Sequence, residues 1–326
     1  STLTLVQNTE AGYTFAGFTS TAGTVADNGT FKVPALANNG DSITITATWS
    51  ENSYTITFAP NKPANASHDV ENSTASMTPK YTDKVTLTTN GFTLVGWTFD
   101  SWNTESNGSG TKYTNEQEIT KLSTRAEVIL YAQWKAKTYV VSFEPNTPAD
   151  SSVSGMQTSF NATYDSAFKA TLATPTAEGY EFAGWFTAKV DGTALTNKDG
   201  VVSDIAGTIV DRKWVLDSDA TFFAQWIANE YTITFTKNNE NATGADYTQK
   251  ATYAKEFTLA DCTFTYTGYN FMGWATTASG EVQYQSGTEV KNLTTIKAIT
   301  LYAVWEAKTL TITLDATTNG GTCETA

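Results

Sequence analysis

Hydrophobic and polar residues alternate one by one in several short segments of the chain. In YTITF, Tyr54, Ile56 and Phe58 are separated by threonines. This alternation is typical of a β-strand with one buried face. Similar segments begin at residues 139, 231 and 310, and no sustained helical period occurs anywhere. The pattern therefore predicts a chain built mainly of β-strands.

A second alternating segment ends on a tryptophan in every copy. Counting back by twos from Trp134 places Ala132, Leu130 and Val128 on the same face. The small alanine recurs at the same depth in each copy, where it leaves room for a bulky neighbour. We expect that neighbour to be an aromatic residue of the phrase described next. The closing tryptophans are Trp49, Trp134, Trp226 and Trp305.

A phrase of glycine and aromatic residues occurs four times, as GYTFAGF, GFTLVGW, GYEFAGW and GYNFMGW. A glycine inside a strand usually marks a bulge or a close backbone approach. In GYEFAGW the alternation predicts Tyr180, Phe182 and Gly184 on one face and Trp185 on the other. We expect these tryptophans to pack in cores, and a sugar-stacking platform is the alternative. The second glycines and following tryptophans are Gly17, Gly96, Trp97, Gly184, Trp185, Gly273 and Trp274.

The two phrases recur in the same order, which predicts a tandem array of small modules. Complete copies span residues 54–134, 139–226 and 231–305, here called the second, third and fourth repeats. The first repeat, 1–49, lacks its opening strand, and 310–326 resembles an orphan opening strand. The spacers SENS, KAKT, IANE and EAKT have four residues each. Such spacers are too short for free tumbling, so they predict an elongated, semi-rigid rod.

Composition and charge narrow the location and the partners. With 20 basic and 33 acidic residues the net charge is −13, which disfavours nucleic acid. No apolar run is long enough to insert in a membrane. Few charges, two cysteines and abundant threonine and asparagine are typical of an extracellular protein on a bacterial cell surface. Cys262 and Cys323 are expected to be unpaired thiols or one pair, and an intermolecular disulfide is the alternative.

Residues for catalysis or metal binding are sparse. The single histidine, His68, lies in an Asn/Ser-rich loop and is expected to be solvated. No HExxH, CxxC, GxSxG or phosphate-binding glycine loop occurs. Asp191, Asp199 and Asp204 lack the spacing of an EF-hand and predict a turn rather than a calcium site. The sequence therefore predicts a non-enzymatic protein without cofactors.

The opening strand, the glycine phrase and the closing L-Y-A-x-W together resemble the internalin-type B-repeat, also called the Listeria–Bacteroides repeat. The match covers nearly the whole chain and includes both phrases in the three complete repeats. The resemblance implies a small β-grasp-like module strung in tandem on bacterial surface proteins and adhesins. Phe18 replaces tryptophan in the first repeat, and the third repeat carries an enlarged loop around Trp214.

These observations predict a stalk or fibre, and two arrangements stay open. The chain is either a window on a longer array of further repeats or a subunit that assembles head-to-tail with itself. In the second arrangement a donor strand, carrying Leu310, Ile312 and Leu314, would fill the gap in the first repeat of the next subunit. The alternative function is an adhesin that binds a host glycan or protein. Trp102 and Trp214, outside the shared phrases, are its candidate residues.

Overall fold

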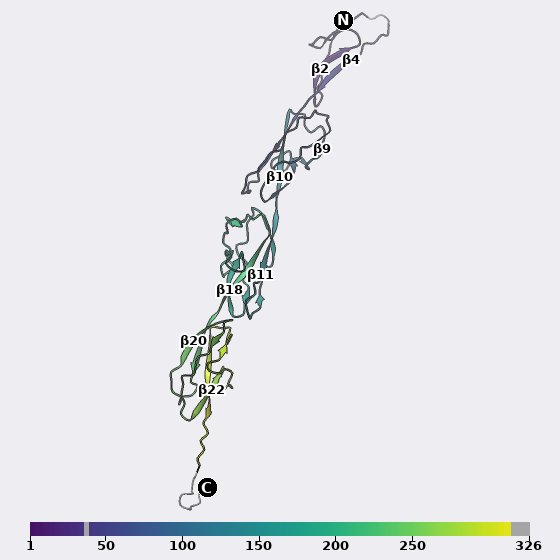
Figure 1. The fold of residues 1–326 in the computed structure, drawn as a ribbon. Coiled ribbons are helices and arrows are strands. Elements are labelled where there is room, and N and C mark those ends of the chain that lie inside the picture. The colour runs from purple at the N-terminus through teal and green to yellow at the C-terminus, as the bar shows by residue number, and fades with distance from the viewer. Residues whose placement is uncertain (36–38, 314–326) are drawn as a thin grey trace, which may run out of the picture. The chain divides into compact units, whose positions relative to one another are not determined.

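The computed structural model describes residues 1–35 and 39–313 of the chain. Within them the backbone forms strands β1 to β24 and no helix, which confirms the prediction of a mainly β chain. The course of the chain is drawn in Figure 1. It divides into two compact units, one of Ser1–Val140, Asn161–Phe168 and Ala206–Asp219, the other of Val141–Phe160, Lys169–Ile205 and the chain from Ala220 onward.

In the second repeat the closing strand lies at the centre of a sheet with the order β5-β10-β7-β8. The opening strand β5 runs parallel to β10, and β7 runs antiparallel to it. One face of this sheet buries Tyr54, Ile56 and Leu130 in a common core. The strands are β5 (Thr55–Ala59), β6 (Val85–Thr86), β7 (Trp97–Asn103), β8 (Lys112–Tyr113), β9 (Glu118–Ile119) and β10 (Glu127–Ala136).

The third repeat keeps this arrangement in a larger sheet with the order β12-β14-β15-β18-β11-β13. Its opening strand β11 is again parallel to its closing strand β18. The enlarged loop adds the small hairpin β16-β17. The strands are β11 (Thr138–Glu144), β12 (Val153–Ser154), β13 (Phe160–Thr163), β14 (Thr176–Ala177), β15 (Tyr180–Phe186), β16 (Ile209–Val210), β17 (Lys213–Trp214) and β18 (Ala220–Ala228).

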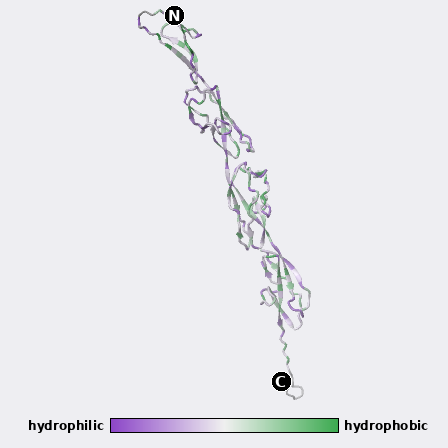
Figure 2. Cartoon of the chain, turned by 180° about the vertical axis from the view of Figure 1, so that it is seen from behind, coloured by the Kyte–Doolittle hydropathy of each residue, from purple (hydrophilic) through white to green (hydrophobic). Residues whose placement is uncertain are grey.

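The fourth repeat has the order β20-β19-β24-β22, with β19 parallel to β24. Along these strands hydrophobic and hydrophilic residues are interspersed, as expected for sheets with one buried face (Figure 2). The strands are β19 (Glu230–Thr236), β20 (Tyr247–Thr252), β21 (Phe257–Thr258), β22 (Tyr269–Ala275), β23 (Glu289–Val290) and β24 (Ala298–Ala307).

The first repeat contains two strand pairs, β1-β3 and β2-β4. Within the described residues, β4 pairs with β2 and with no second strand. Residues 310–313 form no strand, while Leu314 and the rest of the predicted orphan strand, with Cys323, lie outside the described residues. The strands are β1 (Thr2–Thr4), β2 (Tyr13–Ser20), β3 (Thr30–Lys32) and β4 (Ile45–Glu51).

A β-bulge sets the faces of the glycine phrase in the third repeat. Phe182 pairs with Trp226 and Trp185 pairs with Ala224, with a register shift between them. Residues opposite one another in an antiparallel pair share a face, and a bulge inserts one extra residue. Phe182 and Trp185 therefore lie on the same face, with ring centroids 5.5 Å apart. The expectation that Trp185 faces away was wrong, whereas the bulge expected at the glycine is confirmed.

The phrase of the second repeat lies five residues further along the chain than the sequence comparison placed it. Trp102 pairs with Ala132, and Phe99 pairs with Trp134. In the third repeat the corresponding pairs are Trp185 with Ala224 and Phe182 with Trp226. The structural phrase is thus GWTFDSW, beginning at Gly96. The assignment of Gly96 and Trp97 as the second glycine and core tryptophan was wrong. They take the places of Gly179 and Tyr180 at the start of the strand.

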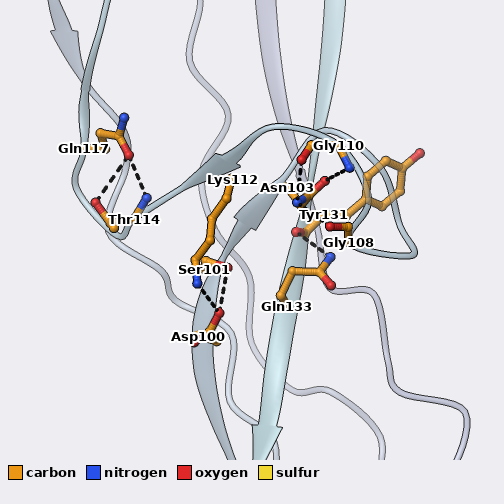
Figure 3. A network of polar contacts seen from close by, with 10 residues as sticks. All are labelled: Asp100, Ser101, Asn103, Gly108, Gly110, Lys112, Thr114, Gln117, Tyr131 and Gln133. Carbon is orange, nitrogen blue, oxygen red and sulfur yellow. Dashed lines mark hydrogen bonds and ion pairs between the residues drawn. The ribbon is translucent and has the colours of Figure 1, made fainter.

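Ser101 stands where the third repeat has Gly184, and polar side chains surround it in Figure 3. Its hydroxyl donates to Asp100 Oδ2 at 2.9 Å, and Lys112 binds the same oxygen at 2.8 Å. Two residues on, the buried Asn103 amide donates to the carbonyls of Gly108 and Gly110. These bonds hold the loop that follows β7.

A fully buried tryptophan faces a fully buried alanine across the sheet in each complete repeat. The pairs are Trp102–Ala132, Trp185–Ala224 and Trp274–Ala303. The small alanine leaves this volume to the indole, so the prediction of an aromatic neighbour is confirmed. A second ring, such as Phe182, packs edge-on against the closing tryptophan at 5.6 Å. Such aromatic pairs are worth about 0.5–1.5 kcal/mol beyond their buried area.

The closing tryptophans are half-buried, and in the three complete repeats they tie the end of the opening strand to the sheet. Trp226 Nε1 donates to the carbonyl of Pro145 at 3.0 Å. The next residue, Asn146, has a φ of 42° and donates to the carbonyl of Ala224 at 2.9 Å. Trp134 and Trp305 make the equivalent bonds at 2.8 and 2.9 Å. The indole rings thus pack against the core, while the indole N–H binds a backbone carbonyl.

Replacing Ala224 by leucine is expected to destabilise the third repeat by about 1–3 kcal/mol, because added methylenes in a filled core force side chains off their rotamers. Urea unfolding followed by tryptophan fluorescence measures the change. Thr221→Leu, at an exposed position of the same strand, is the control and should shift stability by no more than about 0.5 kcal/mol. Equal effects of the two substitutions would contradict the tight Trp185–Ala224 packing.

Candidate functional site at the junctions between repeats

Strands run almost without interruption from one repeat into the next. Only Lys137 separates β10 from β11, and only Asn229 separates β18 from β19. Most residues of the predicted spacers therefore belong to strands. The segment between the strands of two repeats is therefore shorter than the four-residue spacer. A hydrogen-bonded strand also leaves the backbone little freedom to bend.

One spacer residue at each junction makes two backbone hydrogen bonds, one to each repeat. Asn229 N–H donates to the carbonyl of Gly179 at 2.9 Å, and its own carbonyl accepts the N–H of Tyr253 at 2.9 Å. The corresponding spacer residues are Asn52, bonded to Gly12 and Tyr81, and Lys137, bonded to Gly96 and Tyr164. Each bond contributes roughly 0.5–1.5 kcal/mol net. The same pair of backbone hydrogen bonds thus occurs at three junctions.

A tyrosine ring of the following repeat lies directly on the glycine that begins the glycine strand. A Cβ atom on Gly12, Gly96 or Gly179 would lie 2.1, 2.1 and 2.4 Å from the nearest ring atom. The three glycines also have φ angles of 80°, 73° and 79°, which other residues rarely adopt. The rings on them belong to Tyr81, Tyr164 and Tyr253. Both the conformation and the space therefore require glycine at this position.

Each junction adds a carboxylate from a different place in the fold. Between the first and second repeats, Glu51 accepts hydrogen bonds from the backbone N–H of Thr82 at 2.5 Å and from its hydroxyl. These two bonds lower the pKa of Glu51. At the same junction, the Thr14 hydroxyl donates to Asn52 Oδ1 at 2.6 Å.

Between the second and third repeats the carboxylate is Asp165, which is 2% exposed. Its Oδ2 accepts Trp97 Nε1 at 2.9 Å and the backbone N–H of Ser67 at 3.1 Å. The adjacent Tyr164 hydroxyl lies 3.3 Å from Nδ1 of His68, which is exposed as expected. Trp97 is thus not a core tryptophan of its repeat: its indole N–H binds the carboxylate of this junction.

Between the third and fourth repeats the carboxylate is Asp150. It accepts Lys291 Nζ at 3.0 Å and Asn292 Nδ2 at 3.1 Å, while its backbone carbonyl accepts the Tyr253 hydroxyl at 3.3 Å. The bond to Lys291 is the largest cause that lowers the pKa of Asp150, and it raises the pKa of Lys291. Both charged groups are partly exposed, so the pair stabilises the junction only modestly.

The aromatic residues predicted for ligand binding are buried. Trp102 and Trp214 are both 0% exposed, so neither offers a platform to a sugar. Trp214 instead stacks on Phe168 with ring centroids 5.5 Å apart. They were the candidates for the adhesin alternative, which an exposed aromatic patch would favour, and their burial gives it no support. Trp102 is the core tryptophan of GWTFDSW, and Trp214 packs in a local core of the third repeat.

Three further kinds of site were considered from the sequence: a metal site, a membrane span and a cysteine thiol. Across residues 1–35 and 39–313, no group of three or more His, Cys, Asp or Glu side chains is arranged to hold a metal ion. The same residues contain no helix of the length and apolarity that a membrane crossing requires. Cys262 is a half-buried free thiol whose pKa is raised by burial.

Sequence reasoning missed the junction residues. The strand alternation and the glycine phrase gave no role to Tyr81, Tyr164 and Tyr253, or to the first glycine of each phrase. The sequence does contain a signal for them, because three features recur together. Each junction has a glycine before an aromatic residue, a spacer, and a tyrosine that follows the third spacer residue by 24 to 29 positions.

Three segments, residues 54–133, 139–206 and 231–304, match the Listeria-Bacteroides repeat domain. Together they cover more than half of the sequence, so the chain belongs to the Listeria-Bacteroides repeat domain family. The family indicated by the glycine and closing phrases is confirmed.

Similar proteins include two from Evansella cellulosilytica and one from Listeria monocytogenes serovar 1/2a. The first two carry names that describe a membrane protein and a Gly-rich membrane protein, each 28% identical, over 84% and 95% of this chain. The third is Internalin H, 29% identical over 52% of this chain. The chain spans about a third of the length of these relatives, with values of 36%, 32% and 31%.

Acidification is expected to release Lys291 from the junction of the third and fourth repeats. The pKa of Asp150 lies below its ordinary value of 3.8. A carboxyl with a depressed pKa stabilises the folded junction above its ordinary pKa, and that contribution is lost as the pH falls through the lowered pKa. NMR titration of the Tyr253 and Asn292 amide signals measures this step.

Asp150→Asn should abolish the step below pH 3.8, whereas Asp191→Asn, in an exposed loop, should retain it. A titration that is unchanged in Asp150→Asn would show that another group governs the junction.

Proposed function

We propose that the chain is a non-catalytic segment of a bacterial cell-surface protein that acts as a semi-rigid stalk. Its β-grasp-like repeats would hold a distance between an attachment point and a more distal part. The family and the names of the relatives support a surface or membrane-associated location. The repeated junction, a tyrosine ring on a glycine, is the observation that carries the proposal.

The junction restrains bending in three ways. The backbone continues as strand, the spacer residue is hydrogen-bonded to both repeats, and the ring fills the space above the glycine. Tyr164 and Tyr253 are 0% and 5% exposed, so bending at their junctions would return a large aromatic surface to water. Burial of such a side chain is worth about 1.5–3 kcal/mol.

A fibre formed by strand donation is the second candidate, and the edge of β4 supports it. The closing strands β10, β18 and β24 each pair with a parallel opening strand, whereas β4 has no such partner within the described residues. An unpaired edge readily accepts a strand. Leu310 and Ile312, 85% and 75% exposed, would be buried by such pairing. No observation favours the adhesin alternative, since its candidate tryptophans are buried.

Removing the ring at one junction should widen the distribution of distances between two repeats. Spin labels at Ser154 and Glu281, both exposed, report on the third and fourth repeats after Cys262 and Cys323 are replaced by serine. We expect one narrow distance distribution by electron–electron resonance in the parent chain and a broad one in Tyr253→Ala and Gly179→Ala.

Gly207→Ala is the matched control, because Gly207 has a φ of 74° and no atom within 4 Å of an added Cβ. It carries the same backbone strain but leaves the junction intact, so its distribution should stay narrow. A broad distribution in the parent chain would rule out the stalk.

Deleting residues 309–326 should abolish any polymers of the chain if strand donation forms a fibre. A shorter deletion, of residues 317–326, keeps Leu310, Ile312 and Leu314 and should preserve them. Electron microscopy and light scattering of the purified chain measure both outcomes. Polymers that survive the longer deletion would exclude donation by this strand.

A further inference from the structure

The glycine that begins the fourth glycine strand has the geometry of a junction but no ring on it. Gly268 has a φ of 82°, and its carbonyl accepts the N–H of Lys308 at 2.8 Å. Gly179 has the same conformation and the same bond, from Asn229. An added Cβ on Gly268 would meet nothing within 4 Å, whereas on Gly179 it would meet Tyr253 at 2.4 Å.

The residues after Lys308 give a second, independent sign of an uncovered surface. Leu310 and Ile312 are 85% and 75% exposed. At the same distance from the preceding spacer residue, Tyr231 and Ile233 are 2% and 0% exposed. Side chains that are core residues in one repeat are thus presented to solvent in the next copy of the same pattern.

We propose that Gly268, Lys308 and Leu310–Ile312 form a docking site for a further repeat of this family that follows in the same polypeptide. The proposal rests on the stalk function. The occupant would lay a tyrosine ring on Gly268, donate that tyrosine's N–H to the Lys308 carbonyl, and bury Leu310 and Ile312 in its own core.

The three existing junctions identify the occupant. In each of them the ring comes from the repeat whose opening strand begins just after the spacer, 24 to 29 residues beyond the spacer residue. At two of them the ring also meets the aromatic residue after the glycine edge-on, Tyr81 meeting Tyr13 at 6.2 Å and Tyr253 meeting Tyr180 at 5.5 Å. Tyr269 stands at that place beside Gly268. The tyrosines of this chain with that role, Tyr81, Tyr164 and Tyr253, already cover other glycines.

A strand donated to the first repeat of another molecule would make a different contact. It would bury Leu310 and Ile312 against β4, but would bring no tyrosine to Gly268. Occupation of Gly268 therefore separates a following repeat from strand exchange between copies.

The test extends the full chain by one repeat. Residues 314–326 are replaced by a second copy of residues 235–313, so that Leu310–Thr313 begin the opening strand of the added repeat. Spin labels at Glu281 and at the copied Glu281 position, with cysteines at 262 replaced by serine, report the distance between the native and added repeats. We expect one narrow distribution, at least twofold narrower than in the same chain with alanine at the copied Tyr253 position. Gly268→Ala should broaden it equally, and Gly207→Ala should not.

The Gly179 junction is measured in the same extended chain with labels at Ser154 and Glu281. A narrow distribution there with a broad one at Gly268 would overturn the docking site and leave the stalk function intact. Broad distributions at both would overturn both proposals. In the chain without the added repeat, Gly268→Ala should have the same small effect on stability as Gly207→Ala. A much larger loss would show that Gly268 already has a partner and would also overturn the site.

Discussion

The packing of one tryptophan against one alanine across two antiparallel strands sets the geometry of every complete repeat. Because Trp185 needs the volume above Ala224, the glycine strand must bulge between Phe182 and Gly184 to bring both rings to the same face. The bulge fixes the register of that strand. Register in turn places Gly179, at its beginning, opposite the spacer residue of the next junction. The core thus determines where a repeat can meet its neighbour.

The junctions combine a constant part with a variable one. The constant part is a positive-φ glycine, a tyrosine ring and a doubly bonded spacer residue, and it recurs at all three junctions. The variable part is a carboxylate that comes from the end of a closing strand in Glu51, but from loops of the third repeat in Asp150 and Asp165. Since Asp165 is buried and Asp150 partly exposed, salt should screen the carboxylate of the third junction more than that of the second.

Strand positions and the alanine–aromatic contact could be predicted because they depend on local alternation. The phrase of the second repeat was misplaced because GFTLVGW ends in the required Gly-Trp, yet it has Leu94 where the other copies have phenylalanine. GWTFDSW keeps that phenylalanine, Phe99, and the core tryptophan, and loses only the glycine, replaced by Ser101. Local patterns could not reveal the ring of Tyr81 on Gly12, because it joins residues far apart along the chain. The burial of Trp214 likewise depends on the hairpin β16-β17, which has no counterpart in the described residues of the other repeats.

The pairing of the first and last strands has a mechanical consequence. The chain enters a complete repeat through its opening strand and leaves through its closing strand, and these two strands are parallel neighbours, as β5 and β10 are from Thr55–Glu127 to Ala59–Tyr131. Tension applied along the polypeptide therefore pulls the two strands past one another from opposite ends. All the hydrogen bonds between them are loaded at once in shear and cannot open one after another as in a zipper. A repeat with this topology resists stretching most strongly along the direction in which the chain itself would transmit force.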